Sequence, residues 1–173
     1  MGERLDIYPD GLKCAPFLAT EKFMLSNRAK YGLKALIYIA QHDGTSVQSA
    51  EIAAAKSIPK KFLDAILLDI KNSGILFSKK GKGGGFQLAK PARRILVGQV
   101  IRTLDGSLAP IECAGQPEGG QPCADCSGEK EDCQVRALMR EVYDAIVGVL
   151  DHRTLEELIQ GPAEMPFILR YDI

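Results

Sequence analysis

Residues 58–91, IPKKFLDAILLDIKNSGILFSKKGKGGGFQLAKP, place a helical pattern directly before a glycine-rich turn between two strand-like segments. Pro59 suits the first turn of a helix, and Gly74 is a suitable residue to end it. The apolar residues between them that recur at helical spacing, and so predict a buried face, are Phe62, Leu63, Ile66, Leu67 and Ile70. The strand-like segments 75–78 and 86–88 flank a Gly/Lys tip, which predicts a β-hairpin.

Two further helices are predicted upstream of this stretch. In 26–44, SNRAKYGLKALIYIAQHDG, Ser26 is a suitable N-cap and Gly44 a suitable end. The apolar residues that recur there at helical spacing are Ala29, Leu33, Leu36, Ile37 and Ala40. Residues 49–58, SAEIAAAKSI, predict a second, short helix with Ser49 as its N-cap. Three helices followed by a hairpin is the order of a winged helix-turn-helix, whose last helix enters the major groove of DNA.

The second half of the chain is also predicted to be helical. Residues 95–106, ILVGQVIRTLDG, predict a short amphipathic helix, and 134–150, QVRALMREVYDAIVGVL, predict the longest helix. Thr154 and Glu157 form a capping-box pattern for a last small helix, which is expected to end at Gly161. The predicted fold class is mainly α with a small β-hairpin wing, a winged helix-turn-helix followed by a long C-terminal dimerisation helix.

These patterns divide the chain into six predicted segments. They are an N-terminal arm without periodicity (1–23), a winged helix-turn-helix DNA-binding domain (24–96), a connecting helix (97–112), a Cys-rich sensor loop (113–133), the dimerisation helix with a short C-terminal helix (134–160), and a tail (161–173).

The formal net charge is zero, but the charge is unevenly distributed along the chain. Residues 24–96 carry 13 Lys and Arg against 4 Asp and Glu, whereas residues 97–173 carry 6 against 14. A basic half suggests a nucleic-acid face, and an acidic half suggests contacts with a partner or effector. No apolar run approaches the ~20 residues of a membrane span, and the start of the chain lacks the order of a secretory signal. We therefore expect a cytoplasmic protein without membrane contact.

Basic side chains cluster at the positions of the predicted motif that would face DNA. The third helix begins with two lysines, suited to phosphates or guanine edges, and continues with Asp64, suited to a cytosine amino group. Further basic residues lie at the hairpin tip and near the start of the first helix, where they can contact phosphates. The predicted DNA-binding residues are Arg28, Lys30, Lys60, Lys61, Asp64, Lys79, Lys80 and Lys82. Any one lysine could simply be solvated, but their coincidence with the motif favours double-stranded DNA as the partner.

The sequence offers little for enzymatic chemistry. The glycine-rich segment 81–86, GKGGGF, lacks the Lys-Ser/Thr pair of a phosphate-binding loop and precedes a strand-like segment, not a helix. His42 and His152 are the only histidines, and no nucleophile has a base at readable spacing. We therefore do not expect an enzyme.

Four of the five cysteines lie in 113–133, CAGQPEGGQPCADCSGEKEDC, with the spacing C-x9-C-x2-C-x6-C. The predicted metal ligands are Cys113, Cys123, Cys126 and Cys133; Cys14 lies in the arm and is expected to play no part. Four thiolates suit either zinc or an iron–sulfur cluster. Structural zinc usually takes two close Cys pairs, so the uneven spacing over a Gly/Pro loop favours a cluster, either 2Fe-2S or 4Fe-4S. Zinc stays open as the alternative, and a disulfide switch is the third interpretation.

The cysteine segment cannot fold by burying apolar surface, because it contains almost none. Metal ligation can order such a segment, since the free energy of binding then becomes free energy of folding. Loss or oxidation of the cofactor would disorder the connection between the DNA-reading unit and the long helix. The segment is therefore predicted to be a redox sensor.

The long helix carries a seven-residue apolar repeat, which suits packing against a second copy of the chain. The predicted dimerisation residues are Val135, Leu138, Met139, Val142, Ile146 and Val149. The alternative is that this stripe covers only its own domain. A homodimer would read a pseudo-palindromic operator whose half-sites lie about one helical turn, ~34 Å, apart or a multiple of that distance.

Three stretches of this chain resemble a known family of winged-helix regulators. They are LSNRAKYGLKALIYIA (25–40), the stretch 58–91 and ILVGQVIRTLDG (95–106), and the glycine-rich wing after SGILFSKKG is the most specific part. The family is that of the iron–sulfur cluster regulator IscR, NsrR and CymR, and the resemblance covers about residues 24–160. It implies a homodimeric bacterial transcription factor, often a repressor.

The resemblance also implies a ligand set. Family members with a sensor site place three cysteines before the long helix, the last where Cys133 stands. The fourth ligand in the IscR branch is a histidine at the position of Arg136, and NsrR-like proteins use an acidic residue at the position of Lys30. Neither ligand is present here, so the extra cysteine suggests an all-cysteine site.

Two competing functions remain open at the level of sequence. One is a DNA-binding regulator whose loop carries structural zinc or acts as a metal-free thiol switch. The other is a small iron–sulfur electron carrier, which the basic wing argues against.

Overall fold

The computed structural model describes residues 25–115 and 133–161. Several predictions lie outside these residues. They concern the arm 1–23 with Cys14, the interior of the cysteine segment with Cys123 and Cys126, and the tail after Gly161.

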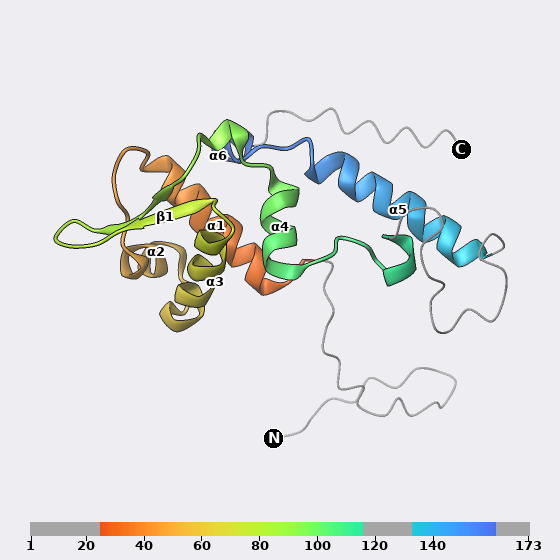
Figure 1. Ribbon diagram of the computed structural model, residues 1–173, viewed down its shortest axis with the longest axis horizontal. Coiled ribbons are helices and arrows are strands. Elements are labelled where there is room, and N and C mark those ends of the chain that lie inside the picture. The colour runs from red at the N-terminus through yellow and green to blue at the C-terminus, as the bar shows by residue number, and fades with distance from the viewer. Residues whose placement is uncertain (1–24, 116–132, 162–173) are drawn as a thin grey trace, which may run out of the picture.

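Three helices form the first part of the fold (Figure 1): α1 (Asn27–Gln41), α2 (Ser49–Lys56) and α3 (Lys60–Asn72). The Ser26 hydroxyl accepts a hydrogen bond from the Ala29 amide (3.1 Å), so Ser26 caps α1 as predicted. Only three residues separate α2 from α3, and the first, Ser57, adopts a left-handed conformation with φ of 52°. This tight link is what a helix-turn-helix requires.

Three local predictions about these helices are wrong. Ser49 lies inside α2 and Gln48 is the N-cap, without a side-chain hydrogen bond. Pro59 is the N-cap of α3 and not part of its first turn. Phe62 is 43% exposed and lies outside the buried stripe, where its ring packs edge-on against Tyr31 with centroids 5.9 Å apart. Because Phe62 is displaced around the helix from the four buried apolar residues, the aromatic partner on α1 only half covers it.

The wing is an antiparallel hairpin of β1 (Leu76–Lys79) and β2 (Gly85–Leu88), in which Leu76 faces Leu88. Each observed strand lies one residue away from its predicted start. An isolated bridge joins Val47, before α2, to Phe86, so a third extended segment lines the hairpin. A Cβ on Gly85 would come within 2.5 Å of the Val47 carbonyl oxygen, which explains why this strand begins with glycine.

The later elements are the short 3-10 turn η1 (Ala92–Arg94), α4 (Val97–Asp105), a second turn η2 (Glu112–Ala114), α5 (Gln134–Leu150) and α6 (Leu155–Gln160). Glu157 and Thr154 form the predicted capping box at the start of α6. No helix in the described ranges is both long and apolar enough to cross a membrane.

One apolar core joins α1, α3 and α4. Its fully buried members from these helices and their connections include Leu36, Ile39, Leu63, Ile66, Leu67, Ile70, Ile75, Ile95 and Val100, and α6 adds Leu155. The predicted segments 24–96 and 97–112 therefore share a single core. The fold is mainly helical with a two-stranded wing, which confirms the predicted fold class.

The helix α5 differs from the rest because none of its residues is buried. In Figure 1 it extends away from the α1–α4 core, with η2 alongside it.

Candidate nucleic-acid interface and cysteine segment

The outward face of α3 is opposite the core. The helix buries Leu63, Ile66, Leu67 and Ile70. At 100° per residue, the opposite side carries Lys61, Ala65, Leu68 and Asn72, and all four are exposed. In a helix-turn-helix this is the side that lies in the major groove.

Lys60 and Asp64 form an i,i+4 ion pair with an Nζ to Oδ2 distance of 2.8 Å. The Lys60 ammonium, followed by a hydrogen bond from Ser49, holds the pKa of the Asp64 carboxyl below its ordinary value. Lys60 and Asp64, both predicted to contact bases, are therefore paired with each other in this structure. Lys61 is exposed and has no ion pair among the described residues.

Arg28 and Lys30 have different surroundings, although both lie at the start of α1. The Arg28 guanidinium forms an ion pair with Asp69, which links α1 to the far end of α3. Lys30 is exposed. Phosphates approaching Arg28 would therefore compete with a carboxylate of the same chain, and those approaching Lys30 would not face this competition.

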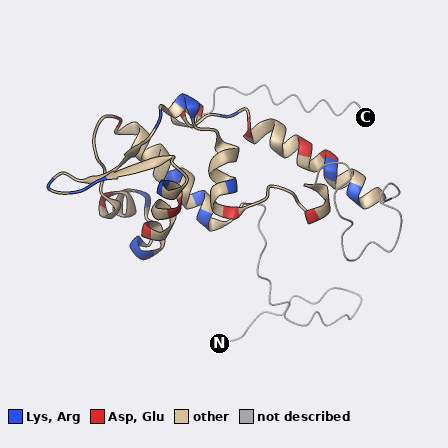
Figure 2. Ribbon diagram, viewed as in Figure 1, with Lys and Arg blue, Asp and Glu red and all other residues tan. Residues whose placement is uncertain are grey.

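The hairpin tip carries the three remaining predicted lysines, Lys79, Lys80 and Lys82, and all are exposed. Figure 2 shows Lys and Arg at this tip and at the lower end of α3, both on the side of the molecule farthest from α5. Positive charge thus gathers at one end of the molecule, on the two elements that a winged helix presents to DNA.

Two of the four predicted metal ligands lie within the described residues. Cys113 is buried in η2, and Cys133 is half-buried at the N-cap of α5. Nineteen residues of sequence separate them, yet η2 packs against α5. The fold therefore brings the two ends of the cysteine segment to the same helix.

Two arginines of α5 hold η2 in place. Arg136 Nε donates to the Cys113 carbonyl oxygen (3.2 Å), and Arg140 Nη1 donates to the Ala114 carbonyl oxygen (3.3 Å). Arg136 follows Cys133 by three residues, so both cysteines approach the first turn of α5. The sequence indicated Arg136 only as the occupant of another protein's ligand position and missed its contact with Cys113.

The donor set fits a thiolate-bound metal centre. Cys113 and Cys133 are the two outer residues of a four-cysteine segment, and a soft metal or an iron–sulfur cluster requires sulfur donors that converge. No group of three or more His, Cys, Asp or Glu side chains suited to a metal occurs within 25–115 and 133–161. A complete site would therefore need donors from outside these ranges, and Cys123 and Cys126 are the ones that the sequence predicts.

Half of the apolar stripe of α5 is exposed. Val135, Leu138 and Val149 are 63%, 55% and 57% exposed, whereas Val142, on the same side of the helix, is half-buried. Met139 and Ile146 are half-buried on the flank of this stripe. Within the described residues, these three side chains of α5 stay more than half exposed.

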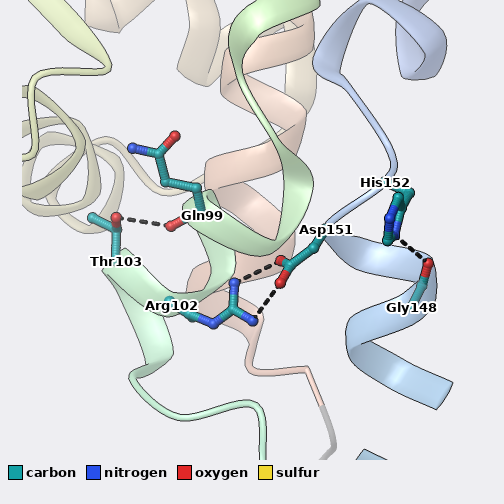
Figure 3. Close-up of polar contacts among 6 residues, drawn as sticks. All are labelled: Gln99, Arg102, Thr103, Gly148, Asp151 and His152. Atoms are coloured by element: carbon teal, nitrogen blue, oxygen red, sulfur yellow. Dashed lines mark hydrogen bonds and ion pairs between the residues drawn. The ribbon is translucent and has the colours of Figure 1, made fainter. Parts of the chain in front are cut away.

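A polar contact ties the end of α5 to α4 (Figure 3). Arg102 donates two hydrogen bonds to the Asp151 carboxylate, at 2.6 and 2.8 Å, and holds the pKa of Asp151 below its ordinary value. A Cβ on Gly98 would come within 2.0 Å of Asp151 Oδ1, so the carboxylate occupies space that only glycine leaves open.

Backbone contacts reinforce this junction. The Val97 amide donates to the Arg153 carbonyl oxygen (2.9 Å), and the Leu155 amide donates to the Ile95 carbonyl oxygen (2.8 Å). The segment after α5 is thus fixed to the segment before α4. Neither contact was predicted, because no sequence periodicity pairs residues 56 or 60 positions apart.

Comparison with known proteins gives the family context. The Rrf2 family profile, described as an iron-dependent transcriptional regulator, matches residues 25–161. An rrf2-like HTH-type transcriptional regulator of Rhodobacter capsulatus is 34% identical over 140 residues, which are 79% of this chain and 92% of that protein. The HTH-type transcriptional regulator IscR of Enterobacter sp. is 32% identical over 138 residues, 79% of this chain and 80% of that protein.

Solved structures of similar proteins have the same fold. CymR of B. subtilis, titled the global cysteine regulator, superposes with a TM-score of 0.64 at 27% identity, covering 80% of this chain and 98% of that one. IscR of T. potens superposes with a TM-score of 0.63 at 24% identity, covering 80% and 88%.

Proposed function

Because this chain belongs to the Rrf2 family of transcriptional regulators, we propose that it is a homodimeric repressor whose DNA affinity depends on a Cys-ligated iron–sulfur cluster. The observation that carries this proposal is the separation of two chemistries along one chain. Lysines gather around α3 and the hairpin tip (Figure 2), whereas η2, which holds Cys113, packs against α5, whose N-cap is Cys133.

DNA is the partner that the charge distribution favours. In the proposed complex, the outward face of α3 enters the major groove and the hairpin tip contacts phosphates. We assign base or phosphate contacts to Lys61 and Lys30, together with the three lysines of the tip. Lys60, Asp64 and Arg28 would take part only after exchanging their present ion-pair partners, so each contact made by them carries a compensating loss.

The homodimer is proposed from the exposed stripe of α5. A helix of 17 residues with no buried side chain receives little stabilisation from its own chain, since most helical stability in proteins comes from packing of an apolar face. A second copy, packed along Val135, Leu138, Val142 and Val149, would supply that packing. The two α3 helices would then read the two halves of a pseudo-palindromic operator.

The proposed ligands of the cofactor are Cys113, Cys123, Cys126 and Cys133. When bound, an iron–sulfur cluster supplies a centre that is lost or changes charge in response to oxidants, iron supply or nitric oxide. The arginines at 136 and 140 donate to the backbone around Cys113, so the first and last of the proposed ligands lie on elements that pack against each other. The iron-dependent regulation in the family's description supports iron over zinc.

The junction of α4 and α5 offers a route from the cysteine segment to DNA. Cys133 caps α5 at one end, and the Arg102–Asp151 pair fixes the other end to α4. α4 shares its core with α1 and α3. A change in the direction of α5 would therefore move the two DNA-reading units relative to each other within the proposed dimer.

Cluster binding is tested by purifying the full chain without oxygen and measuring visible absorption, iron and acid-labile sulfide. We expect iron and sulfide in the wild type, and loss of both in Cys126→Ala. Cys14→Ala is the matched control, since it removes the one cysteine outside the segment, and it should retain the wild-type content. A colourless, zinc-loaded wild type would overturn the cluster and favour structural zinc.

DNA binding is tested by titrating promoter duplexes with cluster-loaded and cluster-free protein at two salt concentrations. We expect tight binding that weakens with salt and differs at least tenfold between the two forms. Equal affinity of the two forms would contradict control by the cluster. Absence of binding by both forms would favour the electron carrier.

A further inference from the structure

We propose that Leu68 and Ala65, on the outward face of α3, contact thymine methyl groups in the major groove and so determine part of the operator sequence. This inference rests on the proposed binding of α3 to DNA. It adds an apolar component to a face for which the sequence suggested only charged contacts.

The exposure of Leu68 is the starting observation. Leu68 is 52% exposed, the highest value among the large apolar side chains of α1 to α4 and the wing. It lies opposite the buried stripe of α3, and so is not a marginal member of the core. Ala65 precedes it by three residues on the same side of the helix and is also exposed.

The charged residues around Leu68 favour a nucleic acid as the partner that covers this face of α3. Lys61 lies two turns before Leu68 on the same face, and three lysines extend from the hairpin tip. An apolar contact between positive charges fits a major groove, in which phosphates flank the base edges and thymine presents a methyl group.

Neighbouring polar groups do not cover this face. Asp64 is held by Lys60, and Asp69 by Arg28, so the carboxylates on the two flanks of α3 are already paired. The pairing removes negative charge that would otherwise repel phosphates near Leu68. The centre of the face is left to Lys61, Ala65 and Leu68, which offers one cation and two apolar groups to the bases.

The experiment requires an operator selected by the wild-type full chain from random duplexes. Each thymine in one half-site is then replaced singly by deoxyuridine, which removes only the methyl group. We expect one or two positions at which this replacement weakens wild-type binding by roughly fourfold, the effect of one buried methyl-sized group.

The Leu68→Ala variant turns this scan into a test of the contact. It should bind the thymine operator at least fourfold more weakly than wild type does, and deoxyuridine at the thymine that Leu68 contacts should cause it no further loss, whereas a thymine contacted by Ala65 should keep its full effect. Leu158→Ala on α6 is the matched control, an identical truncation of another exposed leucine, and should show the full wild-type response. The thermal midpoint of Leu68→Ala should stay within about 2 °C of wild type, because an exposed side chain contributes little to stability.

Three outcomes would overturn the inference. Enrichment of an operator in which no deoxyuridine replacement matters excludes methyl contacts while leaving the proposed function intact. Equal sensitivity of Leu68→Ala and wild type at every thymine position removes Leu68 from the methyl contact. A change in oligomeric state of Leu68→Ala with unchanged DNA preference assigns the face to a protein contact. Failure to enrich any sequence overturns the proposed function itself.

Discussion

The helices α3 and α5 carry similar apolar stripes in opposite situations. α3 buries four apolar side chains against α1 and α4, whereas α5 is longer and buries none. The apolar period is the same in both helices, so the sequence pattern alone does not tell an internal helix from one that requires a second surface. What separates them is whether the rest of the chain can reach the stripe.

The largest expected effect is in the core of α3. Leu67→Ala removes a side chain that is fully buried and should lower the free energy of unfolding by about 2–5 kcal/mol. The loss should be the same at low and high protein concentration, because the contact is internal. Urea unfolding at two protein concentrations measures this loss. A loss that depends on protein concentration would contradict the view that α3 packs inside its own chain.

The counterpart on α5 is Leu138→Asp. A carboxylate within the proposed dimer seam should weaken self-association by roughly a hundredfold, about 3 kcal/mol, while leaving the core of α1 to α4 folded. Analytical ultracentrifugation gives the dissociation constant, and circular dichroism follows folding. Ala137→Asp is the matched control, since it places the same charge about 100° around α5 from Leu138, the nearest residue of the seam. A Leu138→Asp chain that stays dimeric would remove α5 from the interface.

The contact of η2 with α5 can be broken by Arg136→Ala. Loss of the hydrogen bond to the Cys113 carbonyl oxygen should release η2 and raise the alkylation rate of Cys113 by about tenfold in reduced, metal-free protein. Cys133 in the same molecule serves as the internal reference, and mass spectrometry of the labelled peptides separates the two. An unchanged ratio would mean that the fold holds Cys113 without Arg136.

The smallest expected effect is at the junction of α4 and α5. Asp151→Asn removes the charge that Arg102 faces, and because the pair is partly exposed the loss at pH 7 should stay below about 1 kcal/mol. The pKa of Asp151 is lowered in the folded state, so its contribution is present above the ordinary carboxyl pKa and disappears as the pH falls through the folded value.

Wild type and Asp151→Asn should therefore differ in stability at pH 7 and converge as the pH falls through the lowered folded pKa of Asp151. Urea titrations at pH 7 and at a series of acidic pH values measure the difference. If the difference in the free energy of unfolding persists in acid, it comes from disturbed packing around the amide and not from the lost ion pair.

Much of the fold was predictable because its elements have local causes. Ser26 accepts from the Ala29 amide, Thr154 and Glu157 cap each other, and the glycines of the wing allow a tight hairpin. Each of these depends on residues close in sequence. The burial of Phe62 was predicted wrongly, because helical spacing shows which side of the helix a residue lies on but not how far the neighbouring elements cover that side.

The candidate site was predictable only in its chemical components. Lysines and cysteines are visible in the sequence, but the ion pair that engages Lys60 with Asp64 and the pairing of Arg28 with Asp69 depend on rotamers and on the packing of α1 against α3. The exposure of Leu68 is likewise a property of the packed helix. Such contacts have no periodic signature.

By itself the sequence determined the order of helices and strands, the basic character of one half and the cysteine-rich character of the connection, since all three follow from side-chain chemistry and short-range spacing. Only the tertiary structure decided that η2 meets the first turns of α5, that Arg102 meets Asp151, and that, among the described residues, Val135, Leu138 and Val149 of α5 stay exposed. The reason is physical: these features depend on which surfaces remain once one core has formed, and that outcome depends on the whole chain.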